Sequence, residues 1–343
     1  MTYKIGVDNF DKREWEQHAL NFADYNIYQT WAYQEIRAKR DQQEVSRIIV
    51  KDEKDNIQIM CQIRIKNIKC FGLRIGYAQW GPLIRSEKDE LKCTIQALKA
   101  LREAYIGKKI DVLRFTPNIC NNEMGNQISK MLISSGFQRD NMYAPYRSLF
   151  VRVDDSEKEI FNRMHGDWRR NIRKAQKADL TINDTSNYKY FDVLKNLYSE
   201  AKKRKGFSGV DAQVFAETQY NLSDGEKMTI ISVLHKEKPI TVLLVSFLGD
   251  TAVIICSANT KEGLKFGSSY LARYRAAILA LHGGIKWLDL GGIDPRKNPK
   301  VYKYKKRMGG EELYHIGAFD AFSSFRAKVI WNTIGKLYFA LKR

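Results

Sequence analysis

The sequence predicts a mixed α/β protein built from two similar units in tandem. The chain has 343 residues, and at about 150 residues per domain two domains are expected. Its hydrophobic fraction of 44% is enough to build a core in each domain. One order of strands and helices also occurs twice along the chain, which favours an internal duplication.

The first copy begins with a hairpin of two apolar strands, at 45–50 and 57–65, joined by a polar turn. A helix over 88–105 is predicted next, because leucine and isoleucine recur there every three or four residues. We expect this helix to end near Gly107 and a buried strand to follow over 110–115. A second helix and a strand region complete the copy.

The second copy repeats this order. Strands are predicted at 228–234, 240–248 and 252–258, with a turn at Lys238-Pro239 between the first two. A helix over 268–282 then leads to a strand at 285–290. Matched points in the two copies lie 183, 175 and 174 residues apart (57 and 240, 110 and 285, 136 and 310). Such similar offsets predict two copies of one domain, although helix–strand alternation also arises by chance.

A strongly basic helix is predicted between the copies, over 158–177. Phe161, Met164, Trp168 and Ile172 recur at helical spacing and form its apolar face. Seven lysines and arginines against two acids make the other face cationic, which suits contact with phosphates or a solvated surface equally well. The phosphate-binding candidates on this helix are Arg169, Arg170, Arg173 and Lys174.

Composition indicates a reduced, cytoplasmic protein with polyanionic partners. The net charge is +19, which favours RNA, DNA, anionic lipid or phosphorylated metabolites as ligands. We expect no signal peptide, since the first residues carry charges throughout, and no apolar run approaches the ~20 residues of a membrane span. Five scattered cysteines and five dispersed histidines predict free thiols and no metal site.

The stretch 285–310 is where chemistry is expected. Seven of the residues in 296–307 are lysine or arginine, none is acidic, and Tyr302 and Tyr304 lie among them. Cations beside aromatic rings suit a flexible polyanion whose bases stack, while a solvated surface loop would have a similar composition. The chain has no phosphate-binding loop, dinucleotide fingerprint or nucleophile elbow.

This stretch resembles the end of the Fem-type aminoacyltransferases, which consist of two acetyltransferase-like (GNAT) domains. Their signature there is a D-x-G-G turn, a loop, an F-K dipeptide and a pair of glycines. This sequence contains counterparts of these parts in the same order. They are the turn Asp289-Leu290-Gly291-Gly292, the dipeptide Tyr304-Lys305 and the pair Gly309-Gly310. Tyr304 departs from the usual Phe, keeping the ring and adding a hydroxyl.

Other segments between about 25 and 320 agree with this resemblance. Gln29 to Tyr33 is similar to an early Q-S-W-x-W segment, with Arg37 at a basic phosphate-binding position. Asn171 to Ala175 resembles an N-I-R-x-A helix, and Arg204 to Phe207 an R-x-G-F segment. Tyr77 to Pro82 resembles Y-x-P-R-G-P, but Gln79 and Trp80 replace its Pro and Arg. The second copy contains no heptad-rich insertion, so the chain resembles a member without the long helical arm.

The resemblance implies an aminoacyltransferase of peptidoglycan biosynthesis, which builds interpeptide bridges. Such enzymes move an amino acid from aminoacyl-tRNA, the co-substrate, to an amine on the stem peptide of a UDP-linked or lipid-linked muropeptide. No further cofactor or metal is implied. The resemblance implies that Lys305 is catalytic and stabilises the developing oxyanion. The implied substrate-binding residues are Arg37, Tyr77, Arg204 and Tyr304. Lys303 and Lys306 join the helix 158–177 candidates as predicted tRNA contacts.

The expected domains are a first GNAT-like domain over 1–148 and a second over 149–319. A helix within 320–343 is expected to return to the first domain. Its apolar stripe has basic flanks that also suit peripheral contact with an anionic membrane. The residues of this stripe are Ile330, Ile334, Leu337, Tyr338 and Leu341.

Two alternatives stay open at the level of sequence. The first is an acyl-CoA-dependent N-acyltransferase, in which the glycine-containing segment 263–269 would present N–H groups to a pyrophosphate. The second is a non-catalytic RNA-binding protein, whose affinity would fall steeply with salt.

Overall fold

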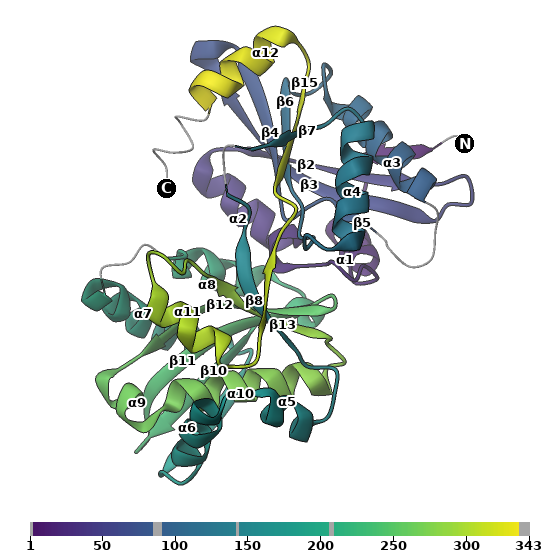
Figure 1. Cartoon of the computed structure of the whole chain (residues 1–343). Helices are drawn as coiled ribbons and strands as arrows, with labels where there is room; N and C mark the ends of the chain where they lie inside the picture. Colours follow the sequence, from purple (N-terminus) through teal and green to yellow (C-terminus); the bar gives the residue numbers. More distant parts are fainter. Residues whose placement is uncertain (1–2, 85–90, 142–143, 206–208, 336–343) are drawn as a thin grey trace. The chain divides into compact units, whose positions relative to one another are not determined.

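The computed structural model describes residues 3–84, 91–141, 144–205 and 209–335, and it divides the chain into two units. The first unit is Met1–Tyr146 together with Tyr314–Arg343, and the second is Arg147–Leu313. Each unit contains one central sheet with helices packed on it (Figure 1).

The first sheet has the strand order β1-β2-β3-β4-β6-β15-β7, with a short β5 paired to β3. All neighbouring strands are antiparallel except the parallel pair β4 and β6. The strands are β1 (Lys4–Val7), β2 (Glu44–Lys51), β3 (Ile57–Ile68), β4 (Leu73–Gln79), β5 (Leu83–Ile84), β6 (Val112–Thr116), β7 (Gln138–Asp140) and β15 (Ala318–Phe322).

The second sheet has the order β9-β10-β11-β12-β13-β8-β14, which repeats the first sheet strand for strand. Its parallel pair, β12 and β13, corresponds to β4 and β6. The strands are β8 (Arg147–Arg152), β9 (Leu180–Thr185), β10 (Thr229–His235), β11 (Lys238–Leu248), β12 (Thr251–Asn259), β13 (Trp287–Gly292) and β14 (Glu311–Tyr314). The shared order confirms the predicted duplication.

The helices of the first unit are α1 (Lys12–Ala19), α2 (Trp31–Asp41), α3 (Leu91–Tyr105), α4 (Glu123–Ser134) and α12 (Phe325–Ile330). Those of the second are α5 (Glu157–Arg163), α6 (Gly166–Gln176), α7 (Phe191–Lys205), α8 (Ala212–Asn221), α9 (Lys261–Phe266), α10 (Ser268–His282) and α11 (Pro299–Lys306). Within the described part of the second unit no helix exceeds 15 residues, as expected for a chain without the long arm.

Alternation along the strands gives the first sheet one apolar and one polar face. Ile63, Ala78 and Leu113 face the core under α3 and α4. Their sequence neighbours Arg64 and Tyr77 must therefore point to the opposite face, because successive side chains of a strand alternate. That face is apolar only near its α12 end and polar toward the carboxyl ends of β4 and β6.

The core of the second unit lies between its sheet and α5, α6 and α10. Small residues of α10, such as Ala276 and Ala277, let this helix approach the strands closely, and Trp168 and Ile172 fill the space from α6. The predicted apolar face of the basic helix is thus a core face.

Two predicted local structures are wrong. The basic helix 158–177 is divided into α5 and α6, because Met164 is extended (ψ 143°) and the His165 side chain caps the new helix. The turn of the second hairpin lies at Lys236-Glu237, not at Lys238-Pro239. Both turn residues have positive φ, 49° and 64°, which proline cannot adopt.

The chain returns to the first unit earlier than the expected residue 320. Strand β15 pairs with β6 and β7, so the residues that follow the end of β14 at Tyr314 belong to the first unit rather than the second. Helix α12 and Trp331 then pack on Leu73, Ile75 and Val112 of the first sheet. Of the predicted stripe, Leu337, Tyr338 and Leu341 lie outside the described residues, as does the side chain of Ile334. In the described ranges, no helix has the length and hydropathy needed to cross a membrane.

Candidate functional site

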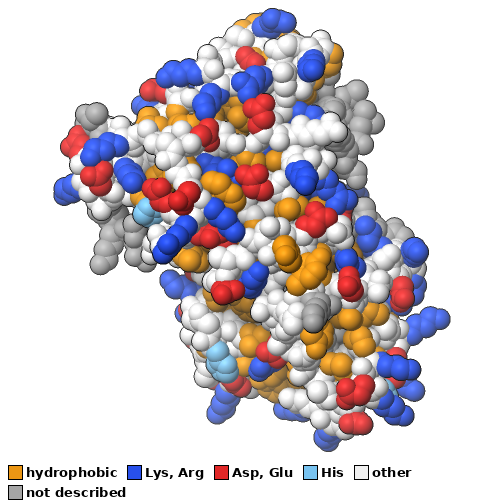
Figure 2. All heavy atoms as spheres, turned by 180° about the vertical axis from the view of Figure 1, so that it is seen from behind, with side chains coloured by type: hydrophobic (Ala, Val, Ile, Leu, Met, Phe, Trp, Pro, Cys, Tyr) orange, Lys and Arg blue, Asp and Glu red, His pale blue; other side chains and the backbone are white. Residues whose placement is uncertain are grey.

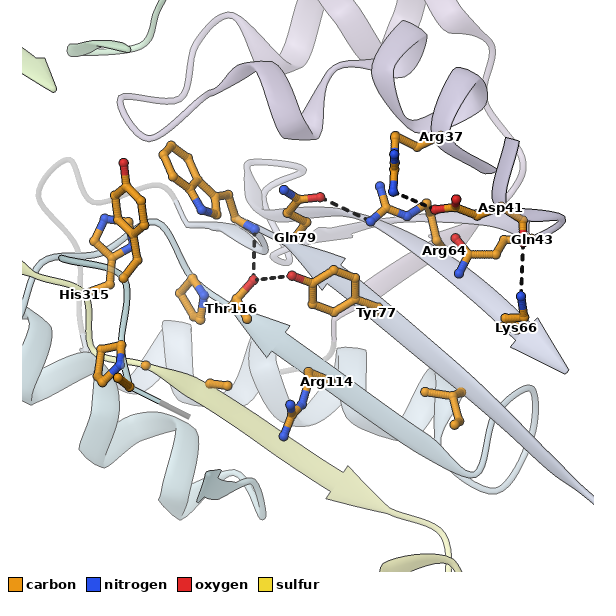
Figure 3. Close-up of a pocket in the computed structure, with 18 of the residues that line it drawn as sticks. Arg37, Asp41, Gln43, Arg64, Lys66, Tyr77, Gln79, Arg114, Thr116 and His315 are labelled. Carbon is orange, nitrogen blue, oxygen red and sulfur yellow. Dashed lines mark hydrogen bonds and ion pairs between the residues drawn. The ribbon is translucent and has the colours of Figure 1, made fainter. Parts of the chain in front are cut away.

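The polar face of the first sheet contains a cavity of about 580 Å³ (Figure 3). It lies toward the carboxyl ends of the parallel strands β4 and β6, where ligands bind in many α/β proteins. Helix α2 and the segments 144–146 and 315–318 complete its wall. The sheet register places Arg64, Tyr77 and Arg114 side by side across three strands.

Buried polar side chains fix the helix that carries Arg37. Thr30 caps α2, and Gln29 before it is fully buried. The Gln29 Nε2 donates to the Gln79 carbonyl (2.9 Å), and its Oε1 accepts from the Gln62 N–H (2.9 Å). The segment that resembles Q-S-W-x-W therefore ties α2 to the same two strands that line the cavity.

Arg64 and Lys66 give the cavity its positive charge, because another cation of this wall, Arg37, is paired with Asp41. The Arg37 Nη2 lies 2.8 Å from the Asp41 carboxylate, and the Arg64 Nη2 donates to the Gln79 Oε1 at 3.2 Å (Figure 3). The Nε of each arginine is buried and makes no hydrogen bond within the described structure. Buried N–H groups of this kind are usually satisfied, so each of these two guanidinium groups, which belong to the wall of the cavity, keeps an unused donor.

Tyr77 lines the same cavity. Its hydroxyl lies 3.3 Å from the Thr116 Oγ1, and the Arg64 guanidinium lies 5.5 Å from its ring centroid. At the other end of the cavity the rings of Trp80, Tyr146 and His315 pack together. Burial lowers the pKa of His315 to about 4, so this wall is uncharged at neutral pH.

The charge of Arg114 is balanced by carboxylates of its own unit. Its guanidinium binds the carboxylates of Asp320 (2.7 Å) and Asp140, and all three side chains are buried. Burial alone would lower the pKa of Arg114, but the hydrogen bonds and charges of the two carboxylates raise it. Arg114 is therefore held as a structural cation.

Lys305 occupies a second site, at the carboxyl end of β13. Its Nζ donates to the carbonyl oxygens of Gly291 (2.8 Å) and Gly292 (3.0 Å), and only 9% of the residue is exposed. Burial and the nearby charge of Arg273 lower the pKa of Lys305 to about 8, against the opposing effect of Asp289. An ammonium has three N–H groups, and these two carbonyl oxygens accept from two of them.

The D-x-G-G turn is built to hold this lysine. The buried Asp289 carboxylate accepts hydrogen bonds from the Gly291 N–H (2.8 Å) and the Ser148 hydroxyl. Gly291 has φ +81°, and a Cβ there would lie 3.1 Å from the Ile254 carbonyl and 3.5 Å from the Lys305 Nζ. Only glycine satisfies both the conformation and the close approach.

Tyr304 is packed inside the unit rather than presented as a free stacking surface. Its ring lies 5.0 Å from that of Trp168 and 4.9 Å from that of Tyr270. The Trp168 Nε1 also donates to the Tyr304 carbonyl at 2.8 Å. The half-buried ring of Tyr304 therefore orients α11 beside Lys305. Contact between Tyr304 and a substrate stays a prediction.

The remaining predicted residues lie outside these two sites. Arg204, on α7, donates to the Asn259 carbonyl at 2.6 Å and does not line the cavity that contains Arg37 and Tyr77. Gly206 and Phe207 of the same segment lie outside the described residues. Arg169 is half-buried, whereas the exposed predicted cations are Arg170, Arg173, Lys174, Lys303 and Lys306.

Some of these cations already have partners within the chain. Arg170 pairs with Asp167 at 2.6 Å, and Lys174 donates to the Lys265 carbonyl at 2.9 Å. On the face that Figure 2 shows, basic side chains are spread over the surface and interleaved with acidic ones. Most of the basic stretch 296–307 forms helix α11, on which Lys303 and Lys306 are exposed.

Three site residues had no prediction from the sequence: Arg64, Arg114 and Arg273. Gln62, Arg64 and Lys66 alternate with isoleucines along β3, and this pattern indicated a polar face. Nothing local marks Arg273, which lies in a helix that is apolar nearly all round. Among the described residues, no group of three or more His, Cys, Asp or Glu could hold a metal ion.

Two backbone N–H groups of the segment 263–269 are already hydrogen-bonded. It contains the end of α9 and the start of α10. The N–H of Gly263 donates to the Thr260 Oγ1, and the N–H of Gly267 to the Leu264 carbonyl. The N–H groups of Gly263 and Gly267 are therefore hydrogen-bonded within the chain.

Comparisons with known proteins agree on one family and one architecture. The model of the FemAB family matches residues 10–234. Among solved structures, FemX is similar with a TM-score of 0.81 at 16% identity, covering 96% of this chain and 99% of that one. A tandem GNAT protein from the clavulanic acid biosynthesis pathway has a TM-score of 0.51 at 9% identity, covering 94% and 99%. Among curated protein sequences, none matches the chain.

A third solved structure extends the likeness to another group of proteins. The C-terminal domain of a putative lysylphosphatidylglycerol synthetase from Agrobacterium fabrum has a TM-score of 0.55 at 9% identity, covering 93% and 96%. At these identities the solved structures establish the fold alone. The predicted fold class, two tandem GNAT-like units, is thereby confirmed.

Proposed function

Because this chain belongs to the FemAB family, the aminoacyltransferases of peptidoglycan interpeptide bridges, we propose that it draws its amino acid from an aminoacyl-tRNA. The acceptor is an amine on the stem peptide of a UDP-linked or lipid-linked muropeptide. The ester of the donor is already activated, so the proposed reaction needs no metal or organic cofactor. The protein's task is to position the amine and to stabilise charge.

The observation that carries this proposal is the environment of Lys305. The attacking amine forms a bond to the ester carbonyl carbon, whose oxygen becomes an oxyanion. The bond to the tRNA ribose oxygen then breaks, and the proton lost by the amine balances the one gained by that oxygen. Two N–H groups of Lys305 are held by Gly291 and Gly292. The third is available to the oxyanion in a site where little reorganisation is needed.

The cavity of the first unit supports a phosphorylated acceptor. Arg37, Arg64 and Lys66 all line its wall. Guanidinium groups bind phosphate oxygens with good geometry. The volume of about 580 Å³ is within the range of small-molecule sites. Tyr77, beside them, is the candidate contact to an uncharged part of the acceptor.

The test is transfer of radiolabelled amino acids from a total charged tRNA pool to a UDP-linked muropeptide. We expect RNase-sensitive incorporation, and a decrease of at least roughly 100-fold in Lys305→Ala, the scale of losing one oxyanion donor. Lys286→Ala, which removes an exposed lysine of the same unit, is the matched control and should keep wild-type activity. A second arm with a lipid-linked muropeptide in anionic vesicles distinguishes the two acceptor forms.

Two outcomes would contradict the proposal. Turnover of an acyl-CoA without transfer from tRNA to either acceptor would favour the acyl-CoA-dependent alternative. Binding of tRNA with a steep salt dependence and no transfer to any acceptor, where Lys305→Ala only weakens the binding, would favour the RNA-binding alternative.

A further inference from the structure

Arg273 is a buried arginine whose contacts join three elements around Lys305. It belongs to α10, and its side chain is only 6% exposed. Its Nη2 donates to the Ser257 Oγ of β12 at 2.8 Å. Its Nη1 donates to the Tyr304 hydroxyl of α11 at 3.3 Å, and the guanidinium carbon lies 5.2 Å from the Tyr304 ring centroid.

The hydroxyl that receives this hydrogen bond is the one by which Tyr304 departs from the usual Phe. A phenylalanine would keep the contact between the ring and the guanidinium, but it would offer Arg273 no acceptor. Tyr304 precedes Lys305 directly in the chain. The short helix α11 is thus fastened, one residue from Lys305, to a charged side chain of another helix.

We propose that Arg273 is a positioning residue for the proposed transfer reaction: it fastens Tyr304 to β12 and α10, so that the Lys305 Nζ stays between the Gly291 and Gly292 carbonyls. The proposal rests on the proposed function for the reaction itself, but its geometry concerns this chain alone. The planar guanidinium of Arg273 donates hydrogen bonds in several directions at once, so it can bridge Ser257 and Tyr304. A lysine side chain ends in a single ammonium group and does not reproduce this bridge.

The charges that face Lys305 are few. Arg273 approaches from α10 and Asp289 from β13, while Tyr304 is its neighbour on α11. The Asp167 carboxylate of α6 is engaged by Arg170 and Arg307. Because Arg273 opposes and Asp289 favours the protonated lysine, removal of the Arg273 charge must raise the pKa of Lys305 from its value of about 8.

Arg273→Lys and Arg273→Gln separate the bridge from the charge. Arg273→Lys keeps the charge and loses the bridge, so we expect kcat to fall roughly 10- to 100-fold, the scale of a misplaced catalytic group, with KM unchanged. Arg273→Gln loses both, so the Lys305 titration should also move to higher pH. Arg275→Lys, on the same helix and paired with Asp184, is the control and should leave both quantities unchanged.

The titration of Lys305 is followed by the ¹³Cε resonance of labelled lysine in the full chain, assigned by its absence in Lys305→Arg. This measurement needs no substrate. If the wild type shows no transfer activity, the proposed function is contradicted, but the titration still tests the effect of Arg273 on Lys305. Wild-type kcat in Arg273→Lys would overturn the positioning role, whether or not Arg273→Gln folds. An unchanged Lys305 midpoint in a folded Arg273→Gln would overturn the electrostatic part.

Discussion

At Lys305, burial and Arg273 act against the protonated form, while Asp289 acts for it. The result is a lysine whose charge changes close to physiological pH instead of near the usual value of 10.5. Because the proposed mechanism needs the ammonium to meet an oxyanion, the protonation state of this one residue governs the reaction.

We therefore expect kcat/KM to fall as pH rises through about 8, since the folded-state pKa of Lys305 is lowered to that value. The profile should be measured with a saturating acceptor and with a donor ester whose hydrolysis is subtracted at each pH. A profile that stays flat up to about pH 10 would contradict this assignment.

The same shift has a consequence for stability. Between about pH 8 and 10.5 the unfolded chain binds the Lys305 proton and the folded chain does not. The contribution of Lys305 to the free energy of unfolding therefore rises with pH across that window. Below about pH 8 both states are protonated, and the buried charge lowers stability by a constant amount.

At the scale of elements, the D-x-G-G turn couples backbone conformation to the site. Gly291→Ala would place a methyl group 3.1 Å from the Ile254 carbonyl and 3.5 Å from the Lys305 Nζ, at φ +81°. We expect a loss of about 1–2 kcal/mol in the free energy of unfolding from the strained φ and a strong loss of transfer activity. Denaturant unfolding and the transfer assay measure the two effects.

Gly284→Ala is the matched control for this turn. Gly284 has φ +70°, but nothing lies within 4 Å of a Cβ built there. The control should lose a similar free energy and keep its activity. Equal activity in both variants would show that the Gly291 carbonyl tolerates displacement and does not position Lys305.

Helix α6 provides a test of the predicted tRNA contacts. Arg170→Gln with Arg173→Gln should lower the slope of log affinity for tRNA against log salt by about 2, roughly one for each lost phosphate contact. The control double variant, Arg13→Gln with Arg40→Gln, removes the same charge from exposed positions of the first unit. If the two double variants gave equal salt slopes, Arg170 and Arg173 would not contact tRNA and would belong to a solvated surface.

Local patterns explain which elements could be predicted. The hairpin of β2 and β3 and the helices α3 and α10 follow from apolar periodicity within a short window. The break between α5 and α6 could not be seen, because the apolar spacing continues through it while the backbone does not. Arg273 was missed for a related reason: its partners, Ser257 and Tyr304, come together only in the folded unit.

At the scale of the whole molecule, the two sheets share one strand order but are assembled from the chain differently. The second sheet uses only strands from 147–314. The first needs β15 from beyond that segment, inserted between β6 and β7. No sequence periodicity reveals this, because the pairing joins residues about 200 positions apart, such as Arg114 and Asp320 (|i−j| = 206).

Two fragments test this arrangement. A chain of residues 147–314 contains every strand of its sheet, and we expect it to unfold cooperatively in denaturant. A chain of residues 1–146 leaves β7 without the strand it pairs with and removes Asp320 from the buried Arg114. Losing one partner of a buried ion pair is strongly destabilising, so this fragment should show no cooperative transition. A native-like transition in 1–146 would contradict the expectation.

The position of β15 also sets an order of events on the ribosome. Strand β7 ends at Asp140 and β15 begins at Ala318. At about 5–20 residues per second, that interval takes tens of seconds or less. During this time the second unit emerges entire, while β6 keeps an open edge that nascent or neighbouring chains can pair with. A premature stop late in translation would therefore harm the amino-terminal unit: the half of the protein made first is the half completed last.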